Sequence, residues 1–383
     1  MNSIKMKLNN AEQNQEDIYV LKHEFLNYLK KKAYKSKKKV YRYCVHKSND
    51  HLTQEMIIVF HKDTIVTPHR HPRGRSESYH VIEGAMNVYF FNDEGKAINA
   101  IKLEEQSRKN FFYYRLSSHT WHMPMPTTEF MIYHETITGP FVDREKDIEY
   151  PSWKQRYNNK DKIKKLTEEF PIKSNKIMHN FGKNFIQHKK SKSLSYFPKN
   201  SSKLRLNQKK IINFGKDFIQ DKKSKSLSYF PKKNSGLTLN KKLISRIKKI
   251  AFKTKKNIRI SLHRSPNEEF HNIIIFHWNS TYYKPHKHLY KEETCHMIEG
   301  SQRVITLDSH AKIIADHKLN SKNNLIFKIK KNTIHTAVIL SKYVIFHESK
   351  PGPYLGDKDS IFPKWAPKED DHKGIKKFFK NLK

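Results

Sequence analysis

The sequence has little cysteine, little glycine and no long apolar run. Only two cysteines, Cys44 and Cys295, occur in 383 residues, too few for a disulfide framework and more typical of free thiols in a reducing compartment. No stretch approaches the roughly 18 apolar residues of a membrane span. The first 20 residues lack the apolar core of a signal peptide. Together these absences predict a soluble, cytoplasmic protein.

Acidic residues are also scarce relative to basic ones. The chain has 76 Lys and Arg against 37 Asp and Glu, a formal net charge of +39. Such an excess would suit an anionic partner such as nucleic acid, a membrane surface or an acidic substrate. The positive charge is spread along the whole chain, however, and abundant Lys, Asn and Ile with only 11 Gly is the pattern that AT-rich codons produce. We therefore favour compositional drift over a dedicated nucleic-acid surface.

The chain contains two copies of one domain. The segment "VYRYCVHKSNDHLTQEMIIVFHKDTIVTPHRH" from Val40 matches "NIRISLHRSPNEEFHNIIIFHWNSTYYKPHKH" from Asn257 without a gap, and both copies continue to "HVIEG" or "HMIEG". A later pair, "WHMPMPTTEFMIYHETITGPF" and "IHTAVILSKYVIFHESKPGPY", keeps its histidine and glutamate at matched positions. These matches indicate an internal duplication.

Each copy is dominated by short strand-like runs. "EMIIVFH", "HVIEGAMNVYFF", "FFYYRL" and "EFMIYHET" are rich in β-branched and aromatic residues and are separated by Asn, Asp, Gly and Pro. Many short strands in roughly 110 residues predict a small antiparallel β-barrel or jelly roll. Apolar residues at helical spacing predict a helix before each copy, within 15–33 and 239–253. The expected fold class is mainly β, with two barrels and short helices before each.

The sequence between the copies differs in character. We expect an N-terminal segment with a helix (1–33), a first domain (34–157), a Lys-rich linker (158–236) and a second domain with a basic tail (237–383). In the linker, "NFGKNFIQHKKSKSLSYFPK" recurs 33 residues later as "NFGKDFIQDKKSKSLSYFPK". Its charge and its Ser, Lys and Asn content predict a flexible segment with transient helix. Aromatic residues interleaved with lysines would also suit nucleic acid, an interpretation that we do not favour.

Each copy carries a cluster of residues that could bind a metal ion. Two histidines one residue apart share a face of a strand, so both imidazoles can reach one ion. A glutamate follows after a turn, and a later histidine on a returning strand would complete the set. The candidate ligands are His69, His71, Glu77 and His122 in the first copy, and His286, His288, Glu293 and His335 in the second.

Three neutral imidazoles and one carboxylate suit Fe, Mn, Ni or Zn as divalent ions and leave open positions for water or substrate. A lone histidine would more often be an ordinary surface or core residue. The matched spacing in two copies instead favours one divalent metal ion in each domain.

The second copy resembles a known family. Its HxH–x4–E–x6–G spacing is similar to the first half of the cupin signature, whereas the first copy has one more residue before its glutamate. With "RISLHRS", "KPHKH" and "HESKPGPYLGDKDSIFPKWAPKED", residues 257–370 resemble the WbuC family of cupin-fold metalloproteins, and residues 40–153 do so less closely. Members of that family often lie among genes for surface polysaccharide synthesis, and their reaction is poorly defined.

The resemblance implies a bicupin that acts on a small anionic carbohydrate or a sugar-nucleotide-like substrate. A metal-dependent isomerase or epimerase, or an oxygenase, would fit. Where the second copy has "SKPGPY" and "FPKWAPK", the first has "TITGPF" and "YPSWKQR". Metal binding is therefore expected in both copies, and substrate binding mainly in the second.

Other matched residues are weaker candidates. Glu135 and Glu348 could be catalytic acid/base groups or could orient a ligand histidine, and a salt bridge to a neighbouring lysine is as good an interpretation. Four residues share strand parity near the expected barrel mouth and could bind a carboxylate or phosphate, or could be surface pairs. These four are Arg42 and His46 in the first copy, and Arg259 and His263 in the second.

Three functions remain open at this point. The chain could be a metalloenzyme for a small anionic molecule, a non-catalytic metal-dependent binding protein, or a polyanion binder that uses its basic linker. Fold alone does not choose among them.

Overall fold

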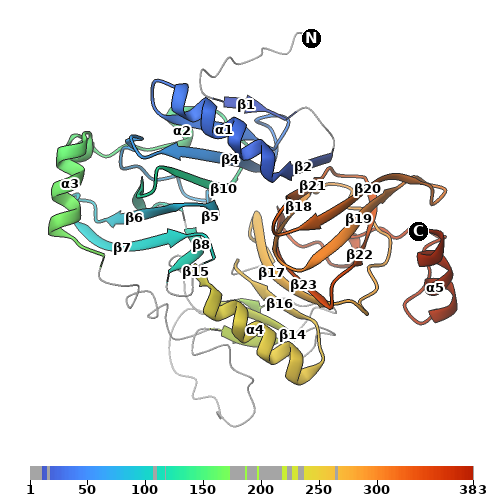
Figure 1. Cartoon of the computed structure of the whole chain (residues 1–383). Coiled ribbons are helices and arrows are strands. Elements are labelled where there is room, and N and C mark those ends of the chain that lie inside the picture. The colour runs from blue at the N-terminus through green and yellow to red at the C-terminus, as the bar shows by residue number, and fades with distance from the viewer. Residues whose placement is uncertain are drawn as a thin grey trace. The chain divides into compact units, whose positions relative to one another are not determined.

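The computed structural model describes most of the chain. The described residues are 11–14, 18–106, 110–116, 118–172, 237–263 and 266–382, with short strands at 186–187, 196–197, 218–221 and 227–231. They form two β-rich units (Figure 1). The first comprises Met1–Gln15, Glu24–Lys183 and Lys233–Arg246, and the second comprises Glu16–His23, Asn184–Lys232 and Ile247–Lys383. The predicted mainly-β class is confirmed.

The first unit is built on one long, mostly antiparallel sheet. Its strands are β1 (Ala11–Gln13), β3 (Val40–Cys44), β4 (Thr53–His61), β5 (Glu77–Glu83), β6 (Ala85–Phe91), β7 (Ala97–Glu104), β8 (Phe111–Leu116), β9 (Trp121–Pro126), β10 (Phe130–Thr138) and β15 (Leu237–Asn240). Their order is β1-β3-β4-β10-β5-β8-β7-β6-β9, with β15 paired to β8. One core cluster, which includes Phe60, Met86, Val88, Tyr114 and Tyr133, joins side chains from both halves of this order.

The second unit repeats this arrangement in two sheets. Its strands are β2 (Ile18–Lys22), β13 (Phe218–Asp221), β14 (Leu227–Pro231), β16 (Ile258–Ser261), β17 (Phe270–Trp278), β18 (Glu293–Glu299), β19 (Ser301–Leu307), β20 (Ile313–Asn320), β21 (Asn324–Ile329), β22 (Ile334–Ile339) and β23 (Tyr343–Pro351). One sheet has the order β13-β14-β16-β17-β23-β18-β21-β2 and the other β20-β19-β22. The run β16-β17-β23-β18-β21 matches β3-β4-β10-β5-β8, and β20-β19-β22 matches β7-β6-β9, so the duplication seen in sequence is a duplication of fold.

A short strand precedes the first helix of each copy, and it pairs with a strand from the other copy of the repeated sequence. The helices are α1 (His23–Lys35) and α4 (Lys241–Thr254), both shorter at their start than predicted. Residues 18–22 form β2, which pairs with β21 of the second unit, and residues 237–240 form β15, which pairs with β8 of the first. The β-branched and aromatic residues of "IYVL" and the alternation in "LTLN" explain why these residues form strands and not a first helical turn.

The glycine of each matched "IEG" segment is required by its backbone. Gly84 and Gly300 have φ values of +79° and +83°, a region that residues with a Cβ rarely adopt. A Cβ would also collide with the carbonyl oxygen of Phe130 at the first position and of Tyr343 at the second. Both glycines therefore mark the point where β5 or β18 passes closely beside the returning strand.

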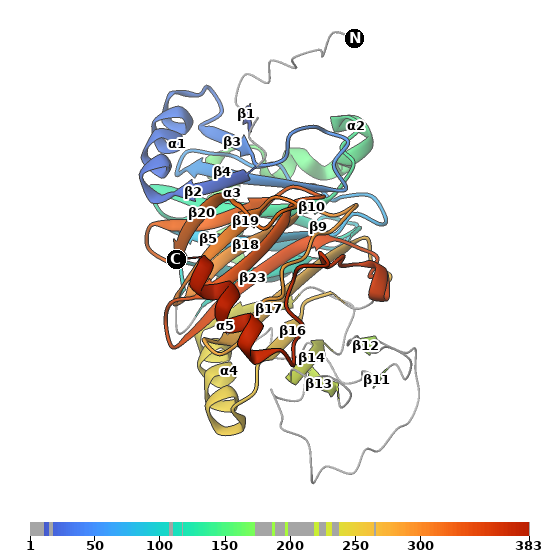
Figure 2. The same cartoon turned by 90° about the vertical axis from the view of Figure 1, so that its right-hand side faces the viewer.

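Further helices flank the strands. They are α2 (Arg144–Asp147), α3 (Lys160–Glu169) and α5 (His372–Asn381). Figure 2 shows α5 near the C-terminus beside the strands of the second unit, where Phe378 and Phe379 pack on the cluster of Ile305, Leu307 and Leu382. None of the helices that the structure describes is both long enough and apolar enough to cross a membrane.

Much of the predicted linker (158–236) lies outside the described residues. Within it the structure describes α3 and two short antiparallel pairs, β11 (Ile186–Gln187) with β12 (Tyr196–Phe197) and β13 with β14. These pairs fall at the same place in the two repeated segments. The described residues of the repeat are thus strands, and the transient helix expected there is wrong for them.

Candidate metal centres

Backbone hydrogen bonds bring the later histidine of each copy beside the first. In the first unit, His69 N donates to His122 O at 3.0 Å and His122 N donates to His69 O at 2.9 Å. In the second unit, His286 N donates to His335 O at 3.1 Å and His335 N donates to His286 O at 2.9 Å. This two-way bridge places the third imidazole, on β9 or β22, beside the two that precede β5 or β18.

The three predicted histidines of each copy form one compact cluster. One ring nitrogen from each of His69, His71 and His122 lies within 4.8 Å of the other two. The predicted glutamate reaches the same point, since Glu77 Oε2 lies 3.2 Å from His71 Nε2 and Glu77 Oε1 lies 3.0 Å from His122 Nε2. All four predicted residues of the first copy therefore meet.

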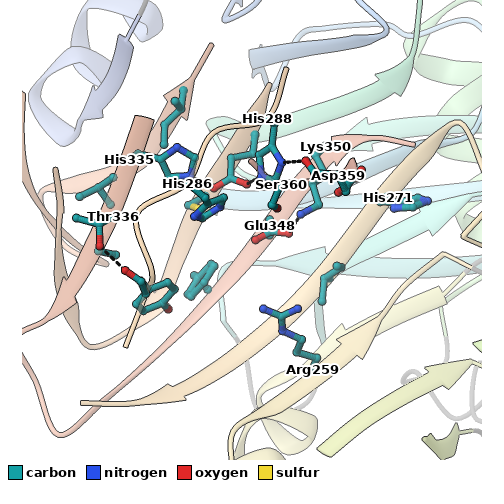
Figure 3. A pocket seen from close by; sticks show the side chains of 18 of the residues that line it. Arg259, His271, His286, His288, His335, Thr336, Glu348, Lys350, Asp359 and Ser360 are labelled. Atoms are coloured by element: carbon teal, nitrogen blue, oxygen red, sulfur yellow. Dashed lines mark hydrogen bonds and ion pairs between the residues drawn. The ribbon is translucent and has the colours of Figure 1, made fainter. Parts of the chain in front are cut away.

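The second copy repeats this geometry. His286, His288 and His335 satisfy the same 4.8 Å criterion. Glu293 Oε2 lies 3.2 Å from His288 Nε2, and Glu293 Oε1 lies 3.4 Å from His335 Nε2. Figure 3 shows the three imidazoles converging at one end of a cavity.

The tautomer of each histidine leaves its Nε2 facing the cluster. All six Nδ1 atoms lie 2.5–3.0 Å from backbone carbonyl oxygens, those of Thr67, Asp147 and Thr120 in the first unit and of Lys284, Asp359 and Thr333 in the second. A carbonyl oxygen can only accept, so each Nδ1 carries the proton and each Nε2 presents a lone pair. Metal-binding histidines are oriented in this way.

Buried polar atoms at the centre of each cluster lack hydrogen-bond partners. Among the described residues, Glu77 Oε2, His122 Nε2 and His335 Nε2 are fully enclosed and make no hydrogen bond. Leaving such atoms unsatisfied is costly, and an ion bound between them would satisfy them. Three imidazole nitrogens and one carboxylate are a donor set that fits Fe(II), Mn(II), Ni(II) or Zn(II).

The charges within the clusters also suit a cation. Burial would raise the pKa of Glu77, but His122 and His71 outweigh burial and lower it. The pKa of Glu293 is likewise lowered, by His288 and His335 against burial. Burial, with His335 adding to it, lowers the pKa of His286 to about 3. Burial likewise lowers the pKa of His69 in the first cluster, whereas Glu77 and Glu293 raise the pKa of His71 and His335 against the effect of burial. Each cluster thus combines an ionised carboxylate with at least one imidazole that burial keeps neutral.

The second unit has a cavity beside its cluster. It has a volume of about 240 Å³. Of the weaker candidates, Arg259, His263 and Glu348 all line it, together with the four metal-binding candidates. Glu348 also lies 2.8 Å from the ammonium of Lys350, which lines the cavity too. Figure 3 shows Glu348 and Lys350 close to the histidines, and Arg259 farther along the same cavity.

Tyrosine rings occupy the matching region of the first unit. Tyr79 pairs across from Glu135 just as Cys295 pairs across from Glu348. The ring of Tyr79 lies 4.7 Å from that of Tyr114 and 4.5 Å from that of Tyr133, centroid to centroid. Burial, with Glu77 adding to it, raises the pKa of Glu135 to about 7. The same barrel position is therefore aromatic and crowded in the first unit and open in the second.

The arginine and histidine candidates have different surroundings in the two units. His46 Nδ1 lies 2.9 Å from the backbone oxygen of Glu55, and His263 Nδ1 lies 2.9 Å from that of Asn272. Both histidines thus support the neighbouring strand, and His263 also faces the cavity. Arg42 is half-buried, and its charge acts on Glu135.

Each unit also contains an ion pair that was not predicted from the sequence. Asp147 is ion-paired with Arg75, and Asp359 with Lys291. A signal for both exists in the sequence. A basic residue stands two positions before the candidate glutamate in each copy, and the aspartate begins the matched segments "DIEYP" and "DSIFP".

A family model described as "Domain of unknown function (DUF6016)" matches residues 21–103 and again residues 239–319, once in each copy. No curated protein matches the chain.

Solved structures similar to the chain include salicylate 1,2-dioxygenase from Pseudaminobacter salicylatoxidans. The identity is 10%, the match covers 91% of this chain and 87% of that one, and the TM-score is 0.50. Adducts of that enzyme from Pseudoaminobacter salicylatoxidans with gentisate match at 9% identity, 88% and 81% coverage and a TM-score of 0.50. A formate complex of Lactobacillus farciminis oxalate decarboxylase matches at 12% identity, 82% and 80% coverage and a TM-score of 0.37.

At these identities the likeness concerns the fold alone. The two barrels and the matched strand orders give the chain a bicupin fold, two barrels in tandem, each with a histidine triad that could hold a metal ion.

Proposed function

We propose that this bicupin binds one divalent metal ion in each barrel and that the second barrel acts on a small anionic molecule. The observation that carries the proposal is the cavity of the second unit. It contains the histidine–glutamate cluster, a glutamate–lysine pair and an arginine within one space of about 240 Å³.

The ligand-binding residues have separable roles. His286, His288, Glu293 and His335 would hold the ion, which when bound supplies a Lewis acid and open positions for a hydroxyl or carboxylate. The side chains of Arg259 and Lys350 supply positive charge for an anionic group. Glu348, which faces the cavity, is the candidate for moving a proton.

The size of the cavity limits the range of possible substrates. Its volume of about 240 Å³ lies just below the roughly 300–1,000 Å³ of typical small-molecule sites. That size favours a small acid, such as a sugar acid, whose anionic group would enter the cavity. An anionic sugar fits this limit. It also agrees with the resemblance of the second copy to the WbuC family, and hence with a role in surface polysaccharide synthesis.

The first barrel would have a supporting role. Its cluster has the same metal-binding residues, but Tyr79 stands at the position of Cys295, which lines the cavity of the second barrel. Ile137 stands where the second barrel has Lys350. We therefore assign metal binding to both barrels and substrate binding to the second. The two cysteines are buried thiols, which fit a reducing compartment such as the cytoplasm.

The proposal is tested on protein purified without added metal. Small molecules that copurify are identified by untargeted mass spectrometry, for the wild type, Arg259→Ala and the matched control Arg42→Ala. An anionic ligand should accompany the wild type and Arg42→Ala and be depleted in Arg259→Ala. Equal amounts in all three would contradict the assignment to the second barrel. Incubating the ligand with fresh protein then separates an isomerase, epimerase or oxygenase, which alters it, from a binding protein, which does not.

A further inference from the structure

One histidine of each cluster is connected to a buried ion pair. In the second unit, His288 Nδ1 lies 2.5 Å from the backbone oxygen of Asp359. The carboxylate of the same Asp359 is ion-paired with the ammonium of Lys291. Lys291 and Asp359 are only 5% and 6% exposed. Lys291 also donates to the backbone oxygen of Pro353 at 2.6 Å.

The first unit has the same arrangement with a different cation. His71 Nδ1 lies 2.9 Å from the backbone oxygen of Asp147, whose carboxylate is ion-paired with Arg75. Asp147 is 3% exposed. The guanidinium of Arg75 also donates to the backbone oxygens of Thr138 at 3.0 Å and Pro140 at 2.6 Å. Two copies that have diverged at most positions thus keep the ion pair while exchanging arginine for lysine.

The basic residue of each ion pair lies close in sequence to the candidate glutamate ligand of the same centre. Arg75 stands two residues before Glu77, and Lys291 two residues before Glu293. One end of each ion pair therefore belongs to the segment that supplies the glutamate, and the other end carries the carbonyl that orients a histidine. Since a hydrogen bond fixes the tautomer and direction of a ligand imidazole, a shift of that carbonyl would turn the imidazole away from the ion.

We propose that Lys291–Asp359 and Arg75–Asp147 are positioning pairs that set the metal affinity of the two centres. Each pair holds the histidine and the glutamate of one centre in register, although neither member touches the ion. In the second unit the pair also fixes a wall of the cavity, because Tyr354, Asp359 and Ser360 line it. The inference rests on the metal centres of the proposed function but not on any substrate.

A positioning role and a purely stabilising role predict different effects when the ion pair is broken. A buried aspartate left without its cation destabilises the fold, whether or not a metal site is nearby. A positioning role predicts in addition a loss of metal affinity in protein that is still folded. Replacing residues that orient metal ligands typically costs about 10- to 100-fold in affinity.

The test uses the full chain with its first centre removed by His71→Ala and His122→Ala. In this background the affinity of the second centre for Co²⁺ is measured by competition with a chromophoric chelator, at a temperature at which circular dichroism shows each variant folded. Asp359→Asn and Lys291→Met should weaken Co²⁺ binding about 10- to 100-fold. Lys291→Arg, which installs the cation of the first unit, should restore affinity to within a few-fold of the parent. As a control, Lys248→Met breaks the ion pair with Glu299 at the far end of β18 and should leave the affinity unchanged.

The outcomes distinguish an error in the metal centre from an error in the positioning role. If the parent chain binds no Co²⁺, the metal centre itself is wrong. If the parent binds and Asp359→Asn and Lys291→Met bind equally well while melting at lower temperature, the pair is structural and the positioning role is overturned. Should a variant not fold, Lys291→Arg and Asp359→Glu decide the question, because both keep the charges and change only the reach of the pair. Asp359→Glu is expected to weaken binding and Lys291→Arg to preserve it, and equal affinity for both would contradict the inference.

Discussion

Tyr114 donates a hydrogen bond of 2.8 Å to Oε1 of Glu77 in the first barrel, and Phe327 holds the matching position in the second. The match follows from register, since Tyr114 pairs with Tyr79 and Phe327 with Cys295. The same glutamate oxygen lies 3.0 Å from His122 Nε2. The carboxylate of the first centre is therefore fixed from behind by a hydroxyl that the second centre lacks.

Tyr114→Phe should destabilise the metal-free chain without removing its first metal ion. A hydrogen bond to a charged group contributes about 1.5–3 kcal/mol, whereas the carboxylate itself stays in place. The free energy of unfolding is measured by denaturant titration, and metal content by elemental analysis. The control Tyr28→Phe removes an exposed hydrogen bond to Glu12 and should change stability by less than about 0.5 kcal/mol. Loss of one metal ion from Tyr114→Phe would show that the hydroxyl is needed for binding itself.

Cys295→Tyr should close the second cavity. It places in the second barrel the residue that fills the first, at a position facing Glu348. Overpacking should cost about 1–3 kcal/mol. The copurifying ligand should disappear while both metal ions remain, as measured by mass spectrometry and elemental analysis. Cys295→Ala, which leaves the space open, should retain the ligand. Full ligand occupancy in Cys295→Tyr would mean that the ligand binds elsewhere.

The strands β2 and β15 give a third prediction. Leu21 on β2 and Leu239 on β15 are both 0% exposed, yet they pair with β21 and β8 respectively. Leu21→Asp should therefore increase hydrogen exchange in β21, and Leu239→Asp should increase it in β8, because each charge would be buried against its own partner strand. Hydrogen exchange with mass spectrometry resolves the two strands. The opposite pattern, with Leu21→Asp loosening β8, would contradict the pairing.

These cases show what sequence reasoning could and could not reach. The first two histidines of each centre were found because their spacing has the period of a strand, and the glutamates and later histidines because they occupy matched positions in the two copies. The pairing of β2 was missed, since its partner Ile326 lies about 300 residues away and local propensity carries no information on distant partners. The pairs of Arg75 with Asp147 and Lys291 with Asp359 also join distant residues, and only their matched positions in the two copies could have revealed them.

The difference between the two barrels was only partly visible in the sequence. The inserted residue before Glu77 and the altered segments after β10 favoured the second copy as the substrate site. The physical basis lies instead in packing, because Tyr79 stands where the second copy has the smaller Cys295. Which side chains fill a barrel depends on all strands together, and spacing within one strand does not show it.

Low pH should weaken the metal-free protein through His286. Burial lowers the pKa of His286 to about 3, compared with about 6.5 in an unfolded chain. A lowered folded-state pKa contributes stability that is present above about pH 6.5 and is lost as the pH falls toward 3. His335 acts in the opposite sense, because Glu293 raises its pKa against the effect of burial. His286→Gln should therefore lose less stability between pH 6.5 and 4 than the wild type.

Melting temperatures in the presence of a chelator test this prediction, with the exposed His310→Gln as control. His310→Gln should follow the wild type across the whole range. If His286→Gln also follows it, the buried imidazole does not contribute to acid lability.

Elemental analysis of the purified chain tests the central claim most directly. The account predicts about two divalent ions per chain. His288→Ala with His335→Ala should remove one, His71→Ala with His122→Ala should remove the other, and all four changes together should leave none. Each double variant should keep the ion of the unaltered barrel, because each cluster is complete within its own unit. Retention of both ions by the double variants would contradict the assignment of these histidines as ligands.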